Sequence, residues 1–101
     1  MKTIMVRYKT SASQADANEA LVRAVFAQLR DRSPAGVRYA TFRLADGVSF
    51  MHIATVESTD ENPLTSLPAF KEFQKELKAR CTEPPQFTEL SAIGSYGGAT
   101  Q

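Results

Sequence analysis

Residues 37–56 read VRYATFRLADGVSFMHIATV, and this stretch decides the fold. Two runs rich in β-branched and aromatic residues, 37–44 and 48–56, are separated by residues 45–47. The separating residues include an Asp-Gly pair, which tolerates the positive backbone angles that tight hairpin turns require. The stretch therefore predicts an antiparallel β-hairpin.

The sequence before the hairpin predicts a strand and an amphipathic helix. Residues 2–9 (KTIMVRYK) alternate with the period of two that is typical of a half-buried strand. The polar stretch 11–16 precedes apolar residues at helical spacing, and Pro34 and Gly36 end that pattern. The apolar positions of this predicted helix are Leu21, Val22, Val25, Phe26 and Leu29.

The sequence after the hairpin predicts a second helix and a last strand. Pro68 suits the first turn of a helix, where its missing N–H is not needed, and Pro84 and Pro85 end the helical pattern. Residues 86–96 form the predicted last strand, and residues 97–101 a flexible tail. The apolar positions of the second helix are Phe70, Phe73, Leu77 and Cys81.

The predicted order β, α, β, β, α, β is that of a ferredoxin-like α+β fold, formed by a single domain over residues 1–96. Right-handed crossovers place both helices on one face of a four-stranded antiparallel sheet. We expect the helix-covered face to carry Ile4, Val6, Phe42, Met51, Ile53, Leu90 and Ala92. We expect the open face to carry Met5, Arg7, Tyr39, Thr41, Arg43, Phe50, His52, Ala54, Phe87, Glu89, Ser91 and Ile93.

The predicted open face is half apolar, which suggests a partner. Soluble monomers rarely expose apolar patches larger than a few hundred Å². A second copy of the same chain is the simplest cover, so we expect a homodimer formed through this face.

Composition excludes several classes of protein. The 101 residues carry a formal net charge of +1, which gives no electrostatic footprint for nucleic acid or an anionic membrane. The longest apolar run is residues 24–27, far short of a membrane span. The N-terminus lacks the apolar core of a secretory signal, and the single Cys81 cannot form an intramolecular disulfide, so we expect a cytoplasmic protein.

Candidate site residues come from the predicted open face. His52, with Arg7 and Arg43, forms the predicted catalytic group, in which the imidazole takes a proton and an arginine holds the resulting oxyanion. A hydrogen-bonded interior or interface role for His52 stays open. The predicted substrate-binding residues are Met5, Tyr39, Thr41, Phe50, Phe87, Glu89 and Ser91.

No metal site or cofactor is predicted. His52 and Cys81 do not form a ligand set, and the acidic residues Glu57, Asp60 and Glu61 suit a solvated loop.

Two other classes of protein with this strand order fit the sequence poorly. RNA-recognition motifs need more aromatic residues and a basic surface, and acylphosphatases need a glycine-rich turn after the first strand, where this chain has KTSASQADA.

Three segments resemble the antibiotic biosynthesis monooxygenase superfamily of dimeric α/β barrels. They are residues 61–73 (ENPLTSLPAFKEF), 50–53 (FMHI) and 94–96 (GSY), and the resemblance spans residues 2–96. It implies two ferredoxin-like subunits packed sheet to sheet. Some members oxygenate aromatic polyketides or quinols without metal or flavin, others degrade haem, and many have no known activity.

The chain departs from the haem-degrading branch. It has no tryptophan, and Asn18 and Asn62 lie outside the predicted strands, whereas that branch relies on a cavity Trp and Asn. We therefore expect a homodimer that binds a small, partly aromatic organic molecule in the barrel interior. Cofactor-independent oxygenation of a quinol or polyketide-like substrate and a non-catalytic ligand-binding or structural dimer both stay open.

Overall fold

The computed structural model describes residues 1–57 and 62–97. Within these ranges no helix has the length and hydrophobicity needed to cross a membrane. The predicted tail beyond Gly97 and the predicted acidic residues Asp60 and Glu61 lie outside the described residues. The elements in chain order are β1 (Lys2–Thr10), η1 (Ala12–Gln14), α1 (Ala15–Arg32), β2 (Val37–Arg43), β3 (Ser49–Val56), α2 (Pro68–Lys75), α3 (Leu77–Arg80) and β4 (Cys81–Leu90).

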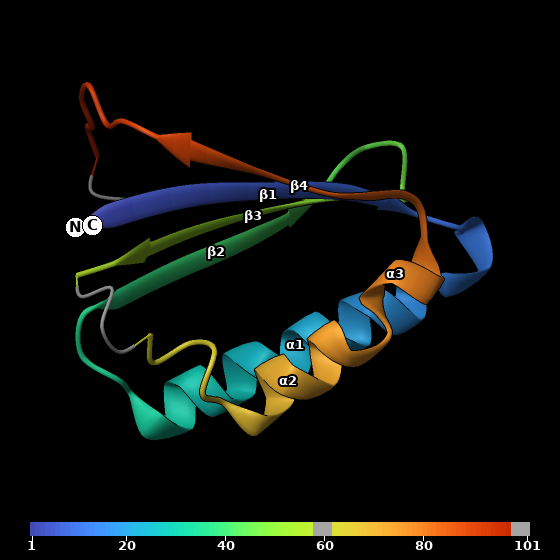
Figure 1. Ribbon diagram of the computed structural model, residues 1–101, viewed down its shortest axis with the longest axis horizontal. Helices are drawn as coiled ribbons and strands as arrows, with labels where there is room; N and C mark the ends of the chain where they lie inside the picture. The colour runs from blue at the N-terminus through green and yellow to red at the C-terminus, as the bar shows by residue number, and fades with distance from the viewer. Residues whose placement is uncertain (58–61, 98–101) are drawn as a thin grey trace.

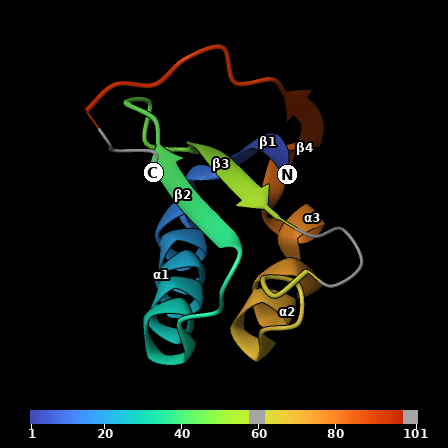
Figure 2. The ribbon, with the colours of Figure 1, turned by 90° about the vertical axis from the view of Figure 1, so that its left-hand side faces the viewer.

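The fold has two layers, a sheet and a layer of helices. The four strands lie in the order β2-β3-β1-β4, and every neighbouring pair is antiparallel. The helices lie together on one side of the sheet, and none of the helices of the described residues lies on the other side (Figures 1 and 2). The predicted ferredoxin-like α+β fold is confirmed.

Helix α1 begins and ends at the polar signals in the sequence. The residue after it, Ser33, adopts the left-handed conformation with φ of 44°. Its backbone N–H donates to the carbonyl of Leu29 at 2.8 Å, which satisfies one of the unpaired carbonyls at the helix end. The face of α1 that points to the sheet buries Ala15, Asn18, Val22 and Val25.

The predicted hairpin is present as β2 and β3. The Asp46 carboxylate accepts hydrogen bonds from the backbone N–H of Val48 at 3.0 Å and of Ser49 at 2.8 Å, and from the Ser49 hydroxyl at 2.6 Å. These bonds, led by that of the Ser49 hydroxyl, lower the pKa of Asp46 to about 2. Gly47 has φ of 79°, so the turn needs glycine there.

The C-terminal part differs from the prediction in its boundaries. The second helix breaks at Glu76, whose φ is −127°, and so forms α2 and the short α3. Cys81 begins strand β4 instead of ending a helix, and β4 spans Cys81–Leu90 rather than 86–96. Pro84 and Pro85 lie within it, where the register to β1 shifts, because an edge strand tolerates residues without an N–H donor.

The register of the sheet corrects the predicted faces of three strands. Strand β1 aligns Val6 with His52 and Tyr8 with Phe50, so His52 and Phe50 share the helix-covered face. The assignments of Ile4, Val6, Met5 and Arg7 in β1 agree with the structure, whereas those in β2, β3 and β4 are inverted. The helix-covered face therefore carries Tyr39, Thr41, Arg43, Phe50, His52 and Ala54, and the open face carries Phe42, Met51, Ile53 and Leu90.

Candidate functional site

His52 lies at the centre of an aromatic cluster between the sheet and α2. Its side chain is 4% exposed. Its ring centroid is 5.3 Å from that of Tyr8 and 5.4 Å from that of Phe73, and it also contacts the ring of Tyr39. His52 is therefore an interior group and does not lie on the open face, so the interior role left open by the sequence agrees with the structure.

Hydroxyl groups satisfy both nitrogens of this imidazole. The Tyr8 hydroxyl lies 2.8 Å from Nε2, and the Thr41 hydroxyl lies 3.0 Å from Nδ1. The Tyr39 hydroxyl also bonds with Nδ1. A buried polar ring is stable in this position because each nitrogen has a partner.

Burial keeps the cluster neutral. It lowers the pKa of His52 to about 4 and raises the pKa of Tyr39 to about 12. Burial also raises the pKa of Tyr8 well above its usual value. Near pH 7 the imidazole and both phenols are therefore uncharged, and His52 is a weak base.

A second polar chain leads into the cluster from the helices. The Arg80 guanidinium donates from Nε to Oδ1 of Asn18 at 3.0 Å and from Nη2 to the carbonyl of Phe73 at 2.7 Å. Asn18 in turn donates from Nδ2 to the Tyr8 hydroxyl at 2.8 Å. Arg80 is 7% exposed and Asn18 is fully buried.

Sequence reasoning missed Tyr8, Asn18 and Arg80 as site residues, although Asn18 carried a signal. Asn18 lies four and seven residues before the buried Val22 and Val25, so a polar side chain occupies the apolar stripe of its helix. Polar residues on such a stripe are candidates for a buried hydrogen-bond network.

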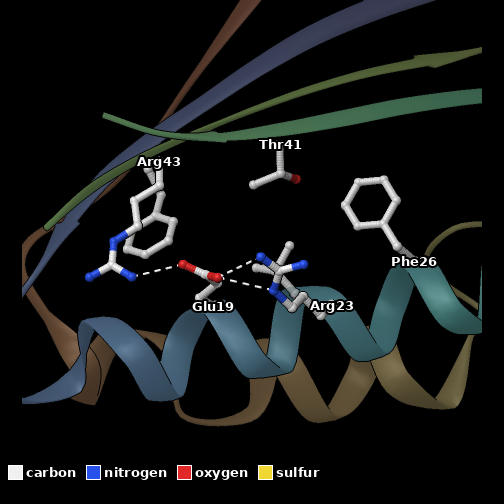
Figure 3. A pocket seen from close by; sticks show the side chains of 7 residues that line it. Glu19, Arg23, Phe26, Thr41 and Arg43 are labelled. Carbon is white, nitrogen blue, oxygen red and sulfur yellow. Dashed lines mark hydrogen bonds and ion pairs between the residues drawn. The ribbon is translucent and has the colours of Figure 1, made fainter. Parts of the chain in front are cut away.

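A pocket lies beside the cluster, between α1 and the edge strand β2 (Figure 3). Its volume is about 230 Å³. Thr41 points into it from β2 and Phe26 from α1 (Figure 3). The residues that line it are Glu19, Val22, Arg23, Phe26, Thr41, Arg43 and Phe50.

Glu19 joins the two arginines of the pocket. Its Oε1 accepts from Arg43 Nη1 at 2.8 Å, and its Oε2 accepts from Arg23 Nη2 at 2.8 Å (Figure 3). These bonds, led by that from Arg43, lower the pKa of Glu19. Asp16 also binds Arg43 at 3.0 Å, so the two guanidinium groups and these two carboxylates carry no net charge together.

The structure brings together five of the predicted site residues. Tyr39, Thr41, Arg43, Phe50 and His52 all lie on the helix-covered face, around the pocket and the cluster behind it.

The other predicted site residues lie elsewhere. Met5 and Arg7 are on the open face, so the predicted grouping of Arg7 with His52 is wrong. Phe87 and Glu89 are exposed on β4. Ser91 follows β4 and lines a second cavity of about 710 Å³, together with Ile53.

No group of three His, Cys, Asp or Glu side chains in residues 1–57 and 62–97 has the arrangement of a metal site. Cys81 is half-buried, and burial raises the pKa of its thiol. The candidate groups around the pocket are therefore hydroxyls, one neutral imidazole, two arginines and the Glu19 carboxylate.

Solved structures share this architecture. No family model and no curated protein matches the chain. A protein named antibiotic biosynthesis monooxygenase is 14% identical, with a TM-score of 0.76 over 93% of this chain and 100% of that one. The chain has the antibiotic biosynthesis monooxygenase fold.

Two further structures of known source have this monooxygenase fold. Rv0793 from Mycobacterium tuberculosis is 20% identical, with a TM-score of 0.74 over 95% of this chain and 98% of that chain. A mutant form of SnoaB, a cofactor-independent oxygenase from Streptomyces nogalater, is 22% identical, with a TM-score of 0.60 over 93% of this chain and 94% of that chain. The likeness extends over nearly the whole chain, and it shows the fold.

Proposed function

We propose that the chain forms a homodimer that binds a small, partly aromatic organic molecule in the pocket between α1 and β2. The observation that carries this proposal is the make-up of the pocket. Phe26, Phe50 and Val22 supply apolar surface, while Thr41 and the arginines supply polar groups at the same cavity. Apolar walls with a few placed polar groups are typical of small-molecule sites.

The size of the pocket limits the ligand. A volume of about 230 Å³ suits one or two fused rings better than a large polyketide. The guanidinium groups of Arg23 and Arg43 can only donate hydrogen bonds, which favours a ligand with an anionic or electron-rich oxygen.

Thermal shift with a panel of aromatic acids and phenols tests the binding proposal. A ligand present at 100 times its Kd is expected to stabilise the protein by about 2.7 kcal/mol. Phe26→Ala removes an aromatic wall of the pocket and is expected to reduce that stabilisation. Phe87→Ala, which truncates an exposed ring on β4 away from the pocket, is the matched control and is expected to keep it.

The open face supports the dimer part of the proposal. Met5, Phe42, Met51 and Ile53 all lie on this face, and Phe42 is 50% exposed. The open face thus carries apolar residues, as the sequence predicts. Of these, Met5 was expected there, whereas Phe42, Met51 and Ile53 were expected on the helix-covered face. Sedimentation of the wild-type chain as a monomer at micromolar concentration would contradict the dimer.

Cofactor-independent oxygenation is a second candidate, favoured by the likeness to SnoaB. In such a reaction a phenol and O₂ give a quinone and water, one oxygen atom entering the ring. Arg43 lines the pocket and is placed to hold the phenolate oxygen. His52 reaches the pocket only through the Thr41 hydroxyl, and its lowered pKa makes it a poor base.

Oxygen uptake separates the two candidates. An oxygenase consumes O₂ with dihydroxyaromatic substrates, and Arg43→Gln, which removes the group placed to hold the phenolate oxygen, reduces the rate while the protein remains folded and dimeric. Ligand-induced stabilisation without oxygen uptake across the panel supports the binding protein.

A further inference from the structure

We propose that the buried chain Arg80–Asn18–Tyr8–His52 directs a hydroxyl proton of Thr41 into the pocket, so that the pocket selects ligands with a hydrogen-bond acceptor oxygen. This inference rests on the proposed function for the place of the ligand, and it deepens that proposal by naming the ligand class. Thr41 is then a binding residue, and the other four are positioning residues.

Arg80 fixes the first step. A guanidinium group can only donate hydrogen bonds, so the Asn18 atom that meets Arg80 Nε at 3.0 Å is the carbonyl oxygen. The amide nitrogen of Asn18 must then face the Tyr8 hydroxyl, to which it donates at 2.8 Å.

The Tyr8 hydroxyl determines which nitrogen of His52 accepts a hydrogen bond. Its oxygen accepts from Asn18, so its single proton is donated to the remaining acceptor nearby, Nε2 of His52 at 2.8 Å. If Nε2 carried a proton instead, Tyr8 would accept twice and its own buried proton would lack an acceptor. An unpaired buried donor is costly, so the neutral imidazole takes the Nδ1–H tautomer. The lowered pKa of His52 agrees with a single ring proton.

On the Nδ1 side of the ring, the Nδ1–H tautomer leaves one proton more than His52, Tyr39 and Thr41 can donate to one another. Nδ1, the Tyr39 hydroxyl and the Thr41 hydroxyl then carry three protons, and a protonated Nδ1 cannot accept. Tyr39 and Thr41 also share a side-chain hydrogen bond, so a chain of donation from Nδ1 to Tyr39 and from Tyr39 to Thr41 uses two of the three protons. The third belongs to Thr41, and Thr41 lines the pocket.

The surplus proton of Thr41 lies in the same pocket as the Arg43 guanidinium. Arg43 lines the same cavity as Thr41, and its guanidinium carbon lies 5.6 Å from the centre of the Phe50 ring. A carboxylate, phenolate or carbonyl oxygen accepts from both groups, whereas an ammonium group accepts from neither. The ligand class is therefore an aromatic compound with an acceptor oxygen.

The first test is the tautomer of His52 in the ligand-free protein. His52 is the single histidine of the sequence, so its ring ¹⁵N resonances need no assignment among several residues. We expect the Nδ1–H tautomer in the wild type. Observation of the Nε2–H tautomer in the wild type would overturn the inference.

Asn18→Asp reverses the chain at nearly constant volume. A carboxylate beside Arg80 accepts from Tyr8, so Tyr8 must accept from His52 and the ring changes to the Nε2–H tautomer. Nδ1 then accepts a proton from the hydroxyl pair, and the surplus at Thr41 disappears. An unchanged tautomer in folded Asn18→Asp would also overturn the inference. Thr41→Val removes the same donor and leaves Arg80, Asn18 and Tyr8 unchanged, so it provides a second variant if Asn18→Asp does not fold.

The second test compares 2-naphthoate with 2-naphthylmethylamine as probes, by titration at pH 7. The wild type is expected to prefer the carboxylate. Thr41→Val is expected to weaken naphthoate binding about tenfold, the loss of one hydrogen bond to a charged acceptor, while Thr41→Ser keeps the affinity. The control Thr55→Val alters a threonine of the open face, hydrogen-bonded to Thr3, and is expected to change nothing.

The outcomes separate this inference from the proposed function. Equal naphthoate affinity of the wild type and Thr41→Val would overturn the role of Thr41 while leaving the pocket in place. Absence of binding by either probe, with the Nδ1–H tautomer observed, would overturn the proposed pocket and the ligand class together.

Discussion

Acidification from pH 7.5 to pH 5 is expected to destabilise the folded chain by about 2 kcal/mol, because His52 resists protonation while folded. Burial lowers its pKa from 6.5 to about 4. The unfolded chain therefore binds one proton more than the folded chain between these values. The contribution of the neutral His52 to the free energy of unfolding is fully present above pH 6.5. It falls as the pH drops toward 4, and it changes little below that.

The window between pH 5 and pH 6.5 isolates this single group. The carboxylates with lowered pKa, Glu19 and Asp46, start from ordinary values of 4.5 and 3.8, so they are ionised in both states there. One proton taken up on unfolding gives a slope that approaches about 1.4 kcal/mol per pH unit.

Urea denaturation across this pH range measures the slope, at one protein concentration so that self-association does not vary. His52→Gln is the control: its lower stability at pH 7.5 is expected to stay nearly constant down to pH 5. The His52 ring ¹³C shift should show no titration above pH 5 in the folded protein. A wild-type stability that is flat over the window, or a ring that titrates near pH 6.5, would refute the reasoning.

Four further substitutions test the core, the open face, the β2–β3 turn and the buried arginine. Phe50→Ala is expected to cost about 3–5 kcal/mol in urea denaturation, because the ring is 1% exposed, whereas Phe42→Ala should weaken self-association in sedimentation and leave the folded subunit intact. Asp46→Ala is expected to lower the melting temperature at pH 7, and the difference from the wild type should vanish below pH 2, where the Asp46 carboxyl is protonated. Arg80→Met is expected to cost about 3 kcal/mol in the same denaturation assay, because it leaves two buried acceptors without a donor; a loss below about 1 kcal/mol would contradict that role.

Local signals predicted the elements well because each depends on neighbouring residues. The turn chemistry of Asp46 and Gly47 sets the register of β2 against β3, which pairs Arg43 with Phe50 and Thr41 with His52. The sequence correctly predicted that these four residues share one face of the sheet. The helix signals at Pro34 and Pro68 act in the same local way.

The faces of the strands could not be predicted with equal success. Strands β1 and β3 are joined through a helix and strand β2, and no turn fixes their register. In β3 both parities carry apolar residues, with Phe50 and Ala54 on one and Met51 and Ile53 on the other, so periodicity alone does not say which faces the helices. The prediction placed the parity of His52, a polar residue, on the open face. In the structure two tyrosines and a threonine satisfy that polarity inside the core.

The corrected faces separate the two surfaces on which the proposals rest. Neighbouring residues of a strand point to opposite sides, so Thr41 lies at the pocket while Phe42 lies on the open face. A pocket formed between the sheets of two subunits would tie ligand binding to dimer formation. A pocket under α1 does not, so Thr41→Val should reduce binding without changing sedimentation, and Phe42→Ala should do the reverse. If both variants change both properties, the ligand and the second subunit share one surface, and the placement under α1 is wrong.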